Sequence, residues 1–363
     1  MKRVYNFYAG PCTLPLEVME EAQRDFLDYA STGMGVIEIS HRSQEFKHIA
    51  EDSEALLREL LHIPDNYRVL FEQGGGRGQF AALPLNLLKE DGVCDYFVTG
   101  HWSNCAQKEC NERYGKGVVH ECTFLNEKGL YAVDFSKMTV TEGADYAYTC
   151  LNETVNGIET AHHLPDTGDV PLVADMSSDI LTRPIDVKKF GVIFFGLQKN
   201  VGPSGMTITI IRDDLIGHAR KYTPSVLDYS ILCKHGSMFN TPCTFAWYMA
   251  YLNFKWIKSI GGISELEKRN IKKSDLFYNY VDKSDFYISK IAKDCRSRVN
   301  CVFSLKDESL NDEFLSLAKA SGLVGLKGHK VLGGMRASMY NAMPYEGVAA
   351  LVDFMQDFAS KHA

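Results

Sequence analysis

Short apolar runs alternate with segments of helical periodicity over the first 260 or so residues, and this alternation restricts the fold most strongly. Strands are expected at residues 67–71, 94–99, 144–150, 171–175, 191–195 and 206–211. Helices are expected from about Pro15, where Thr13 could cap, at 43–61 and at 79–89. Strands that alternate with helices are typical of an α/β fold around a mostly parallel sheet. Ligands of such sheets bind beyond the carboxyl ends of the strands.

The last hundred residues have a different pattern. A charged helix is expected at 266–281, a strand at 300–304 and an amphipathic helix at 347–359. The pattern predicts a smaller α+β domain, with the boundary near Gly261 and Gly262. We therefore expect a large domain at 1–261 and a small one at 262–363, and the N-terminal segment, about 1–15, is a candidate for packing with the small domain.

Composition narrows the class of protein. The chain has 363 residues, 45% of them hydrophobic, and a net charge of −7, which does not favour nucleic acid or an anionic membrane as a partner. No apolar segment follows the basic start of the chain, and the run 191–197 is too short to span a bilayer. The ten cysteines form no CxxC pair, so we expect small buried side chains in a reducing compartment. These features predict a cytoplasmic protein.

Polar or glycine-rich segments follow four of the expected strands. They are 74–78, His101-Trp102, 175–178 and 198–200. Because carboxyl ends of parallel strands meet at one edge of a sheet, these segments are expected to converge on one ligand site.

Lys199 follows the apolar run 192–197 and precedes a loop with glycines at 202 and 205. Most lysines are solvated surface residues, and that is the ordinary alternative here. A lysine partly removed from water has a lowered pKa and becomes an amine nucleophile, as Schiff-base chemistry requires.

Asp175 ends the preceding apolar strand. A carboxylate there could cap a helix or bind a metal, but no further ligand follows at metal spacing, so we expect no metal site. Paired with Lys199, it matches the acid that keeps a pyridinium nitrogen protonated, which makes pyridoxal phosphate (PLP) an electron sink.

The glycine run at 74–76 could hold a phosphate with its backbone N–H groups, or it could be an ordinary turn. A third interpretation is the dinucleotide pattern formed by Gly76, Gly78 and Ala81. Against that interpretation, Asp95 opens the next strand instead of closing it. An NAD-dependent oxidoreductase therefore remains a weaker alternative.

Aromatic and basic residues complete the candidate site. Trp102 could be a core residue or a flat platform for a pyridine ring. The basic residues could lie in solvated turns or bind phosphate and carboxylate groups through charge-assisted hydrogen bonds. They are His41, Arg42, His329, Lys330 and Arg336.

Seven motifs in order resemble one known family. They lie at 6–11, 40–43, 74–80, 152–157, 198–203, 240–242 and 333–344. The chain is similar in these motifs to the phosphoserine aminotransferase family, class V enzymes of PLP fold type I. The resemblance implies an α/β large domain with a mostly parallel seven-stranded sheet, a smaller α+β C-terminal domain, PLP as cofactor, and a homodimer.

The resemblance also implies roles for residues. Lys199 would be catalytic, forming the Schiff base and moving the substrate proton. The other cofactor-binding residues would be Gly76, Arg77, Trp102, Thr154, Asp175, Gln198, and, from the neighbouring subunit, Asn240 and Thr241. Substrate anions would be bound by His41, Arg42, His329, Lys330 and Arg336. Many family members have Arg where this chain has Lys330, so we expect altered affinity for the phosphorylated substrate.

The implied reaction transfers an amino group reversibly between L-glutamate and 3-phosphohydroxypyruvate, giving O-phospho-L-serine and 2-oxoglutarate in L-serine biosynthesis. The family also acts on 4-phosphohydroxy-L-threonine in vitamin B6 synthesis, and the sequence leaves that activity open. The alternatives are another class V PLP enzyme, such as an alanine–glyoxylate aminotransferase or a cysteine desulfurase, and a binding protein without cofactor.

Overall fold

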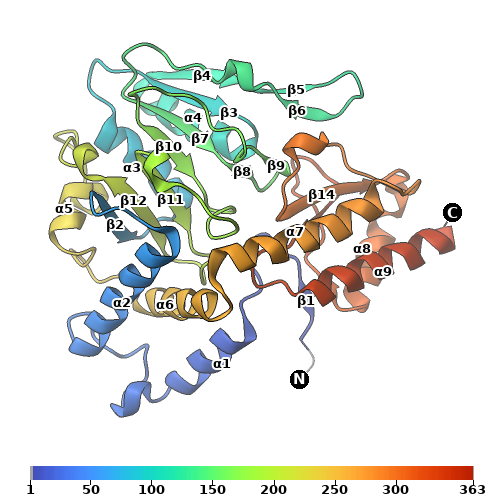
Figure 1. The fold of residues 1–363 in the computed structure, drawn as a ribbon, viewed down its shortest axis with the longest axis horizontal. Coiled ribbons are helices and arrows are strands. Elements are labelled where there is room, and N and C mark those ends of the chain that lie inside the picture. Colours follow the sequence, from blue (N-terminus) through green and yellow to red (C-terminus); the bar gives the residue numbers. More distant parts are fainter. Residues whose placement is uncertain (1–2, 363) are drawn as a thin grey trace.

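A seven-stranded sheet forms the centre of the larger part of the molecule (Figure 1). The structure is a computed structural model that describes residues 3–362. The strand order is β2-β12-β11-β10-β7-β3-β4. All neighbouring pairs from β11 to β4 are parallel, and only β12 runs against both of its neighbours. The expected mostly parallel sheet is therefore confirmed.

Six strands of this sheet lie close to the expected positions, and a seventh, the edge strand β4, was not predicted. The seven strands are β2 (Tyr67–Glu72), β3 (Cys94–Val98), β4 (Gly117–Glu121), β7 (Tyr146–Cys150), β10 (Leu172–Asp175), β11 (Val192–Gly196) and β12 (Thr207–Arg212). Two short hairpins accompany it, β5 (Thr123–Leu125) with β6 (Tyr131–Val133) and β8 (Asn152–Glu153) with β9 (Ile158–Glu159).

Helices cover both faces of the sheet. One face packs against α2 (Gln44–Leu61) and α6 (Thr244–Ser259), and α1 (Leu16–Asp25) packs outside α6. The other face packs against α3 (Gly75–Leu87), α4 (His101–Tyr114) and α5 (Tyr229–Lys234). The central strand β11 is buried on both sides, as its unbroken apolar sequence predicts.

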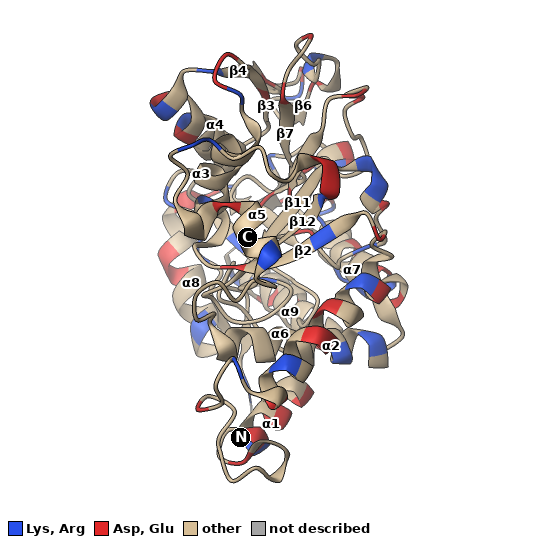
Figure 2. Ribbon diagram, turned by 90° about the vertical axis from the view of Figure 1, so that its left-hand side faces the viewer, with Lys and Arg blue, Asp and Glu red and all other residues tan. Residues whose placement is uncertain are grey.

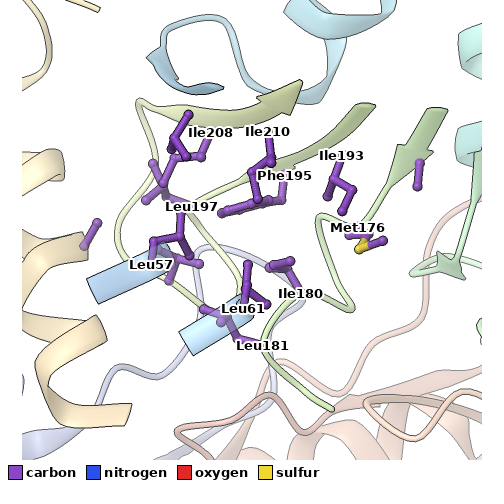
Figure 3. Close-up of a cluster of buried hydrophobic side chains, with 14 of the residues drawn as sticks. Leu57, Leu61, Met176, Ile180, Leu181, Ile193, Phe195, Leu197, Ile208 and Ile210 are labelled. Atoms are coloured by element: carbon purple, nitrogen blue, oxygen red, sulfur yellow. The ribbon is translucent and has the colours of Figure 1, made fainter. Parts of the chain in front are cut away.

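Figure 3 shows the core on the α2 face. Leu57 of α2 lies beside Leu197, and Leu61 of the same helix lies beside Ile180 and Leu181. Because Leu197 is fully buried two residues before Lys199, the chain is fixed just where the candidate site begins.

A second core lies in the C-terminal part of the chain. The sheet there is β13 (Tyr287–Ile288), β14 (Asn300–Leu305) and β16 (Met335–Ser338), covered by α7 (Gly262–Val281), α8 (Asn311–Ala320) and α9 (Tyr345–His362). The first strand, β1 (Tyr5–Asn6), pairs with β15 (Leu323–Val324), and Phe7 belongs to this core. These contacts support a division near Gly261 with the N-terminal segment counted with the small part, and that division stays a proposal.

Two local expectations about helix starts are wrong. Thr13 does not cap α1, because its hydroxyl donates to the carbonyl of Asn6, 3.0 Å away, and α1 has no side-chain cap. Helix α3 begins at Gly75, four residues before the expected start, because only Gly74 stays outside it with a φ of +100°. Ser43 does cap α2, accepting from the backbone of Phe46.

Charges of both signs are distributed over the molecule. Figure 2 shows Lys and Arg interspersed with Asp and Glu along α2 and α7. Within residues 3–362, no helix combines the length and the apolar character needed to cross a membrane.

Candidate active site

Lys199 lies in the turn that follows β11, with only 9% of its surface exposed. Its Nζ donates to Oγ1 of Thr154 at 2.7 Å. Burial lowers the pKa of Lys199, and the nearby carboxylate of Asp175 partly offsets this effect. The sequence prediction of a desolvated amine therefore agrees with the geometry.

Asp175 is the last residue of β10 and pairs in register with Phe194 of the neighbouring strand β11. Its Oδ1 accepts from the backbone N–H of Ser177 at 2.8 Å. Burial raises the pKa of Asp175, and the positive charge of Lys199 opposes that shift. A buried carboxylate thus lies beside the buried amine.

Lys199 and Asp175 both line a cavity of about 240 Å³. Its other lining residues include the glycines of the 74–76 run and predicted cofactor residues. They are Gly74, Gly75, Gly76, Arg77, Phe80, Trp102, Cys150, Asn152, Thr154, Ser177, Ser178 and Gln198. The structure therefore brings together seven of the nine residues predicted to bind the cofactor, the exceptions being Asn240 and Thr241.

Helix α3 directs its N-terminus at this cavity. No side chain caps its first turn, so the N–H groups of Gly75 and Gly76 are free to bind an anion. Gly76 and Gly78 lie inside the helix and not in a strand-to-helix turn, so the dinucleotide pattern does not form its phosphate loop. This geometry speaks against the oxidoreductase alternative.

Trp102 lies in the first turn of α4, where a strand end was expected. Its backbone N–H and that of Ser103 donate to the two carboxylate oxygens of Glu153, each at 2.8 Å. Glu153 is fully buried, and burial raises its pKa. The sequence did not indicate this role, because Glu153 lies fifty residues from the helix that it caps. Nε1 of Trp102 is buried and has no hydrogen-bond partner among residues 3–362.

Arg77 reaches over the face of Trp102, with its guanidinium carbon 5.8 Å from the ring centre. Its Nη2 lies 3.9 Å from Sγ of Cys105. The ring of His101 lies 5.2 Å from that of His329, which comes from the loop before β16. Arg77 and His101 thus lie beside Trp102, which lines the cavity, and His329 reaches them from the other part of the chain.

Arg336, on β16, approaches the site from the small sheet. Its Nη1 donates to the carbonyl of Thr154 at 3.4 Å, and burial lowers its pKa. The buried Nε has no partner in the described part of the chain, which leaves a donor for a carboxylate ligand. Lys330 is exposed on the same loop as His329.

Seven predicted residues do not line the cavity of their own chain: the three just described, His329, Lys330 and Arg336, and four others. His41 and Arg42 lie in the turn before α2, and Asn240 and Thr241 lie exposed before α6. Thr241 still lies near the glycine run, because Nε2 of Gln73 donates to its carbonyl at 3.1 Å.

The donor set fits PLP. A buried amine suits the aldehyde, a buried carboxylate suits the pyridine nitrogen, and an uncapped helix start suits the phosphate. The flat indole of Trp102 lines the same space. Fold and cavity together define a PLP-dependent transferase of fold type I.

Comparisons with known proteins identify the family. The chain belongs to the class-V aminotransferase family, whose model, Aminotransferase class-V, matches residues 4–351. A phosphoserine aminotransferase of Aromatoleum aromaticum is 51% identical over 372 aligned residues, covering all of both chains.

Solved structures give the same result. A phosphoserine aminotransferase from Bacillus circulans subsp. alkalophilus has a TM-score of 0.95 at 41% identity, covering all of both chains. A PLP-bound phosphoserine aminotransferase from Trichomonas vaginalis has a TM-score of 0.90 at 36% identity, covering 98% of this chain and 100% of that one. The predicted family, fold class, cofactor and enzyme type, a PLP-dependent transaminase, are confirmed.

Proposed function

We propose that this chain is a phosphoserine aminotransferase, which transfers an amino group reversibly between L-glutamate and 3-phosphohydroxypyruvate to give O-phospho-L-serine and 2-oxoglutarate, a step of L-serine biosynthesis. The observation that carries the proposal is the buried amine of Lys199, which lies beside Asp175 and an uncapped helix start, in a chain similar over its whole length to enzymes of that name. Activity on 4-phosphohydroxy-L-threonine is a second substrate to test.

The cavity residues hold the cofactor. Lys199 would bind it covalently, and Asp175 would hold its ring nitrogen protonated. PLP, when bound, supplies an electron sink for the bonds at the substrate α-carbon. Trp102 would contact the ring face, Thr154 the ring hydroxyl, and Gly76, Arg77 and Gln198 the phosphate.

Lys199 moves the proton of the reaction. Burial lowers the pKa of this residue, which favours the neutral amine that can take a proton from the substrate α-carbon. The same Nζ would hold this proton and release it later in the reaction, since its pKa is lowered. Thr154 accepts a hydrogen bond from Nζ and so limits the directions in which the amine can point.

Basic residues outside the cavity bind the substrate. Arg336 binds the α-carboxylate, since its buried Nε has no partner in the part of the chain that the structure describes. The substrate phosphate and the side-chain carboxylate of glutamate bind to the remaining four residues, His41, Arg42, His329 and Lys330. His329 has a lowered pKa because of burial and the charge of Arg336, and a bound phosphate would reverse that shift.

The active unit is a homodimer in which Asn240 and Thr241 reach the cofactor phosphate of the neighbouring subunit. Support comes from their exposure and from their absence from the cavity of their own chain. Apolar side chains exposed on the same segment, Tyr222, Val226 and Phe239, offer a surface for the second copy. The ten free thiols fit a cytoplasmic location.

Visible absorption of the purified protein tests the function. With PLP bound, O-phospho-L-serine should bleach the yellow band within seconds, while L-alanine at the same concentration should not. A band that alanine bleaches and phosphoserine does not would favour the alanine–glyoxylate alternative. A protein that stays colourless after PLP is supplied would contradict the role of Lys199.

A further inference from the structure

A series of buried hydrogen bonds connects the amine of Lys199 to the small sheet. Nζ donates to Oγ1 of Thr154 at 2.7 Å, and the Thr154 hydroxyl donates to Oγ of Ser178 at 3.0 Å. Nδ2 of Asn152 donates to the same Ser178 oxygen at 2.9 Å and to Oδ1 of Asn300 at 2.8 Å. Asn300 lies on β14, so the series passes from the large sheet to the small one.

The side-chain amide of Asn300 has a partner for its oxygen and for both of its N–H groups. Its Nδ2 donates to Oγ of Ser338 at 3.0 Å and to the hydroxyl of Tyr340 at 3.1 Å. Tyr340 in turn donates to the carbonyl of Ala9 in the N-terminal segment, at 2.9 Å. Asn300 is fully buried, and an amide has one acceptor oxygen and two donor protons. All three are engaged, which fixes the orientation of the amide.

This fixed amide sets the direction of the bonds that lead to Lys199. Ser178 donates its only proton to the carbonyl of Asn152 at 2.8 Å, so its oxygen must accept from both Thr154 and the Asn152 amide. The proton of Thr154 is therefore committed to Ser178, and an oxygen lone pair faces Nζ of Lys199. Asn300 holds the Asn152 amide on which this arrangement depends.

The same amide contacts the strand that carries Arg336. Asn300 pairs in register with Ser338, and Ser338 lies two residues after Arg336 on β16, on the same face of the strand. One side chain thus contacts both the strand of the substrate-binding arginine and the segment that faces the amine.

We propose that Asn300 is a positioning residue for the transamination, which couples the placement of β16 to the lone pair that Thr154 presents to Lys199. This inference rests on the proposed function, since it assigns a role within the same site. The groups whose charge shifts the pKa of Lys199 are Asp175, Cys150, Glu153 and Arg336, and the Cys12 thiol also lies nearby, donating to the backbone carbonyl of Lys199. Asn300 contacts none of the four, so it acts through Asn152 and Thr154 and not through charge.

The test is Asn300→Leu, which keeps the side-chain volume and removes the three hydrogen bonds. Asn253→Leu is the matched control, because Asn253 is equally buried, on α6, and lies outside the series. The holoenzymes are titrated from pH 5 to 10 while the visible absorption band is recorded. The PLP dissociation constant, kcat and KM are measured in parallel.

We expect the pH midpoint of the visible band to fall by about 0.5–1 unit in Asn300→Leu, because an oxygen acceptor that favours the protonated nitrogen is no longer held in place. We expect kcat to fall about tenfold. The control should keep the wild-type midpoint even if it loses comparable thermal stability. A double variant, Ser338→Ala with Tyr340→Phe, removes both acceptors of the Asn300 amide and gives the same test if Asn300→Leu does not fold.

An unshifted midpoint and unchanged kcat in folded variants would overturn the role of Asn300 and leave the proposed function intact. A wild-type protein without a visible band after PLP addition would overturn the proposed function, and the role of Asn300 with it.

Discussion

The amine nitrogen of Lys199 lies 2.7 Å from the hydroxyl oxygen of Thr154, and the lysine is the donor. The two residues follow different strands, β11 and β8, so the contact forms only when the sheet and the hairpin beside it are assembled. Burial favours the neutral amine, whereas the threonine oxygen stabilises the charged one. This balance between the neutral and the charged amine suits a group that must take up and release a proton within one catalytic cycle.

Replacing Lys199 with alanine removes the amine that binds PLP covalently and moves the proton. We expect the Lys199→Ala protein to lose the yellow band after gel filtration and to lose activity by about 10³-fold or more. Lys189→Ala is the control, because Lys189 is exposed just before β11 and should leave both properties unchanged. Full transaminase activity in purified Lys199→Ala would contradict the PLP mechanism.

Asp175→Asn keeps the shape of the cavity but removes its buried negative charge. We expect PLP to bind, because the amine and the helix start are untouched, and kcat to fall by about 10²–10³-fold, because the ring nitrogen is no longer held protonated. Stopped-flow absorption after addition of glutamate measures the effect. Asp186→Asn, an exposed helix-cap carboxylate, serves as the control. Equal rates in the two variants would exclude Asp175 from the chemistry.

Glu72, beside the glycine run, should make stability depend on pH. Burial raises its pKa from 4.5 to about 7, so the folded chain binds this proton more tightly than the unfolded chain does. The contribution of this protonation to the free energy of unfolding is fully present below pH 4.5. About 2–3 kcal/mol of it is lost as the pH rises to 7.

Urea unfolding of the apoenzyme at pH 5 and pH 7.5 measures this difference. Glu72→Gln should reduce it, because a neutral amide can accept from Gln79 and donate to the nearby hydroxyl oxygen of Thr209 at either pH. The exposed pair Glu59–Lys258 supplies the control variant, Glu59→Gln. The same pH dependence in Glu72→Gln and wild type would show that another group is responsible.

Lys330→Arg tests the proposed role of Lys330 in binding the phosphorylated substrate. A guanidinium can bind phosphate with two parallel hydrogen bonds, which an ammonium cannot do. We expect KM for O-phospho-L-serine to fall about threefold to tenfold, and KM for L-glutamate to change less. Lys327→Arg, on the same segment, is the control. If neither constant changes, Lys330 does not contact the phosphorylated substrate.

The sheet and the chemistry at its edge could be predicted from sequence because both depend on local patterns. The strands are apolar runs, and Asp175 and Lys199 each come directly after or at the end of one. Helix α4 could not be predicted in this way, since only Ser103, Ala106 and Cys110 are buried and no apolar stripe marks it. Helix α6 is apolar on most of its surface, which hides its period.

Contacts between distant segments left no signal in a single sequence. Glu153 caps α4 from another part of the chain, and Asn300 contacts Asn152 across the two sheets. The reversed direction of β12 was equally hidden, because an apolar strand buried on both faces reads the same in either direction.

The pairing of β1 with β15 has a consequence for the order in which the protein matures on the ribosome. Tyr5 is synthesised long before its partner Leu323, because the large sheet lies between them in the sequence. The large sheet can assemble during translation, whereas the N-terminal segment waits for the final domain. Because Tyr340 binds the carbonyl of Ala9 and Asn300 binds Tyr340, the bonds that reach Lys199 are completed only after the segment 300–340 has been synthesised. Nascent chains should therefore acquire a folded sheet before they acquire a competent active site.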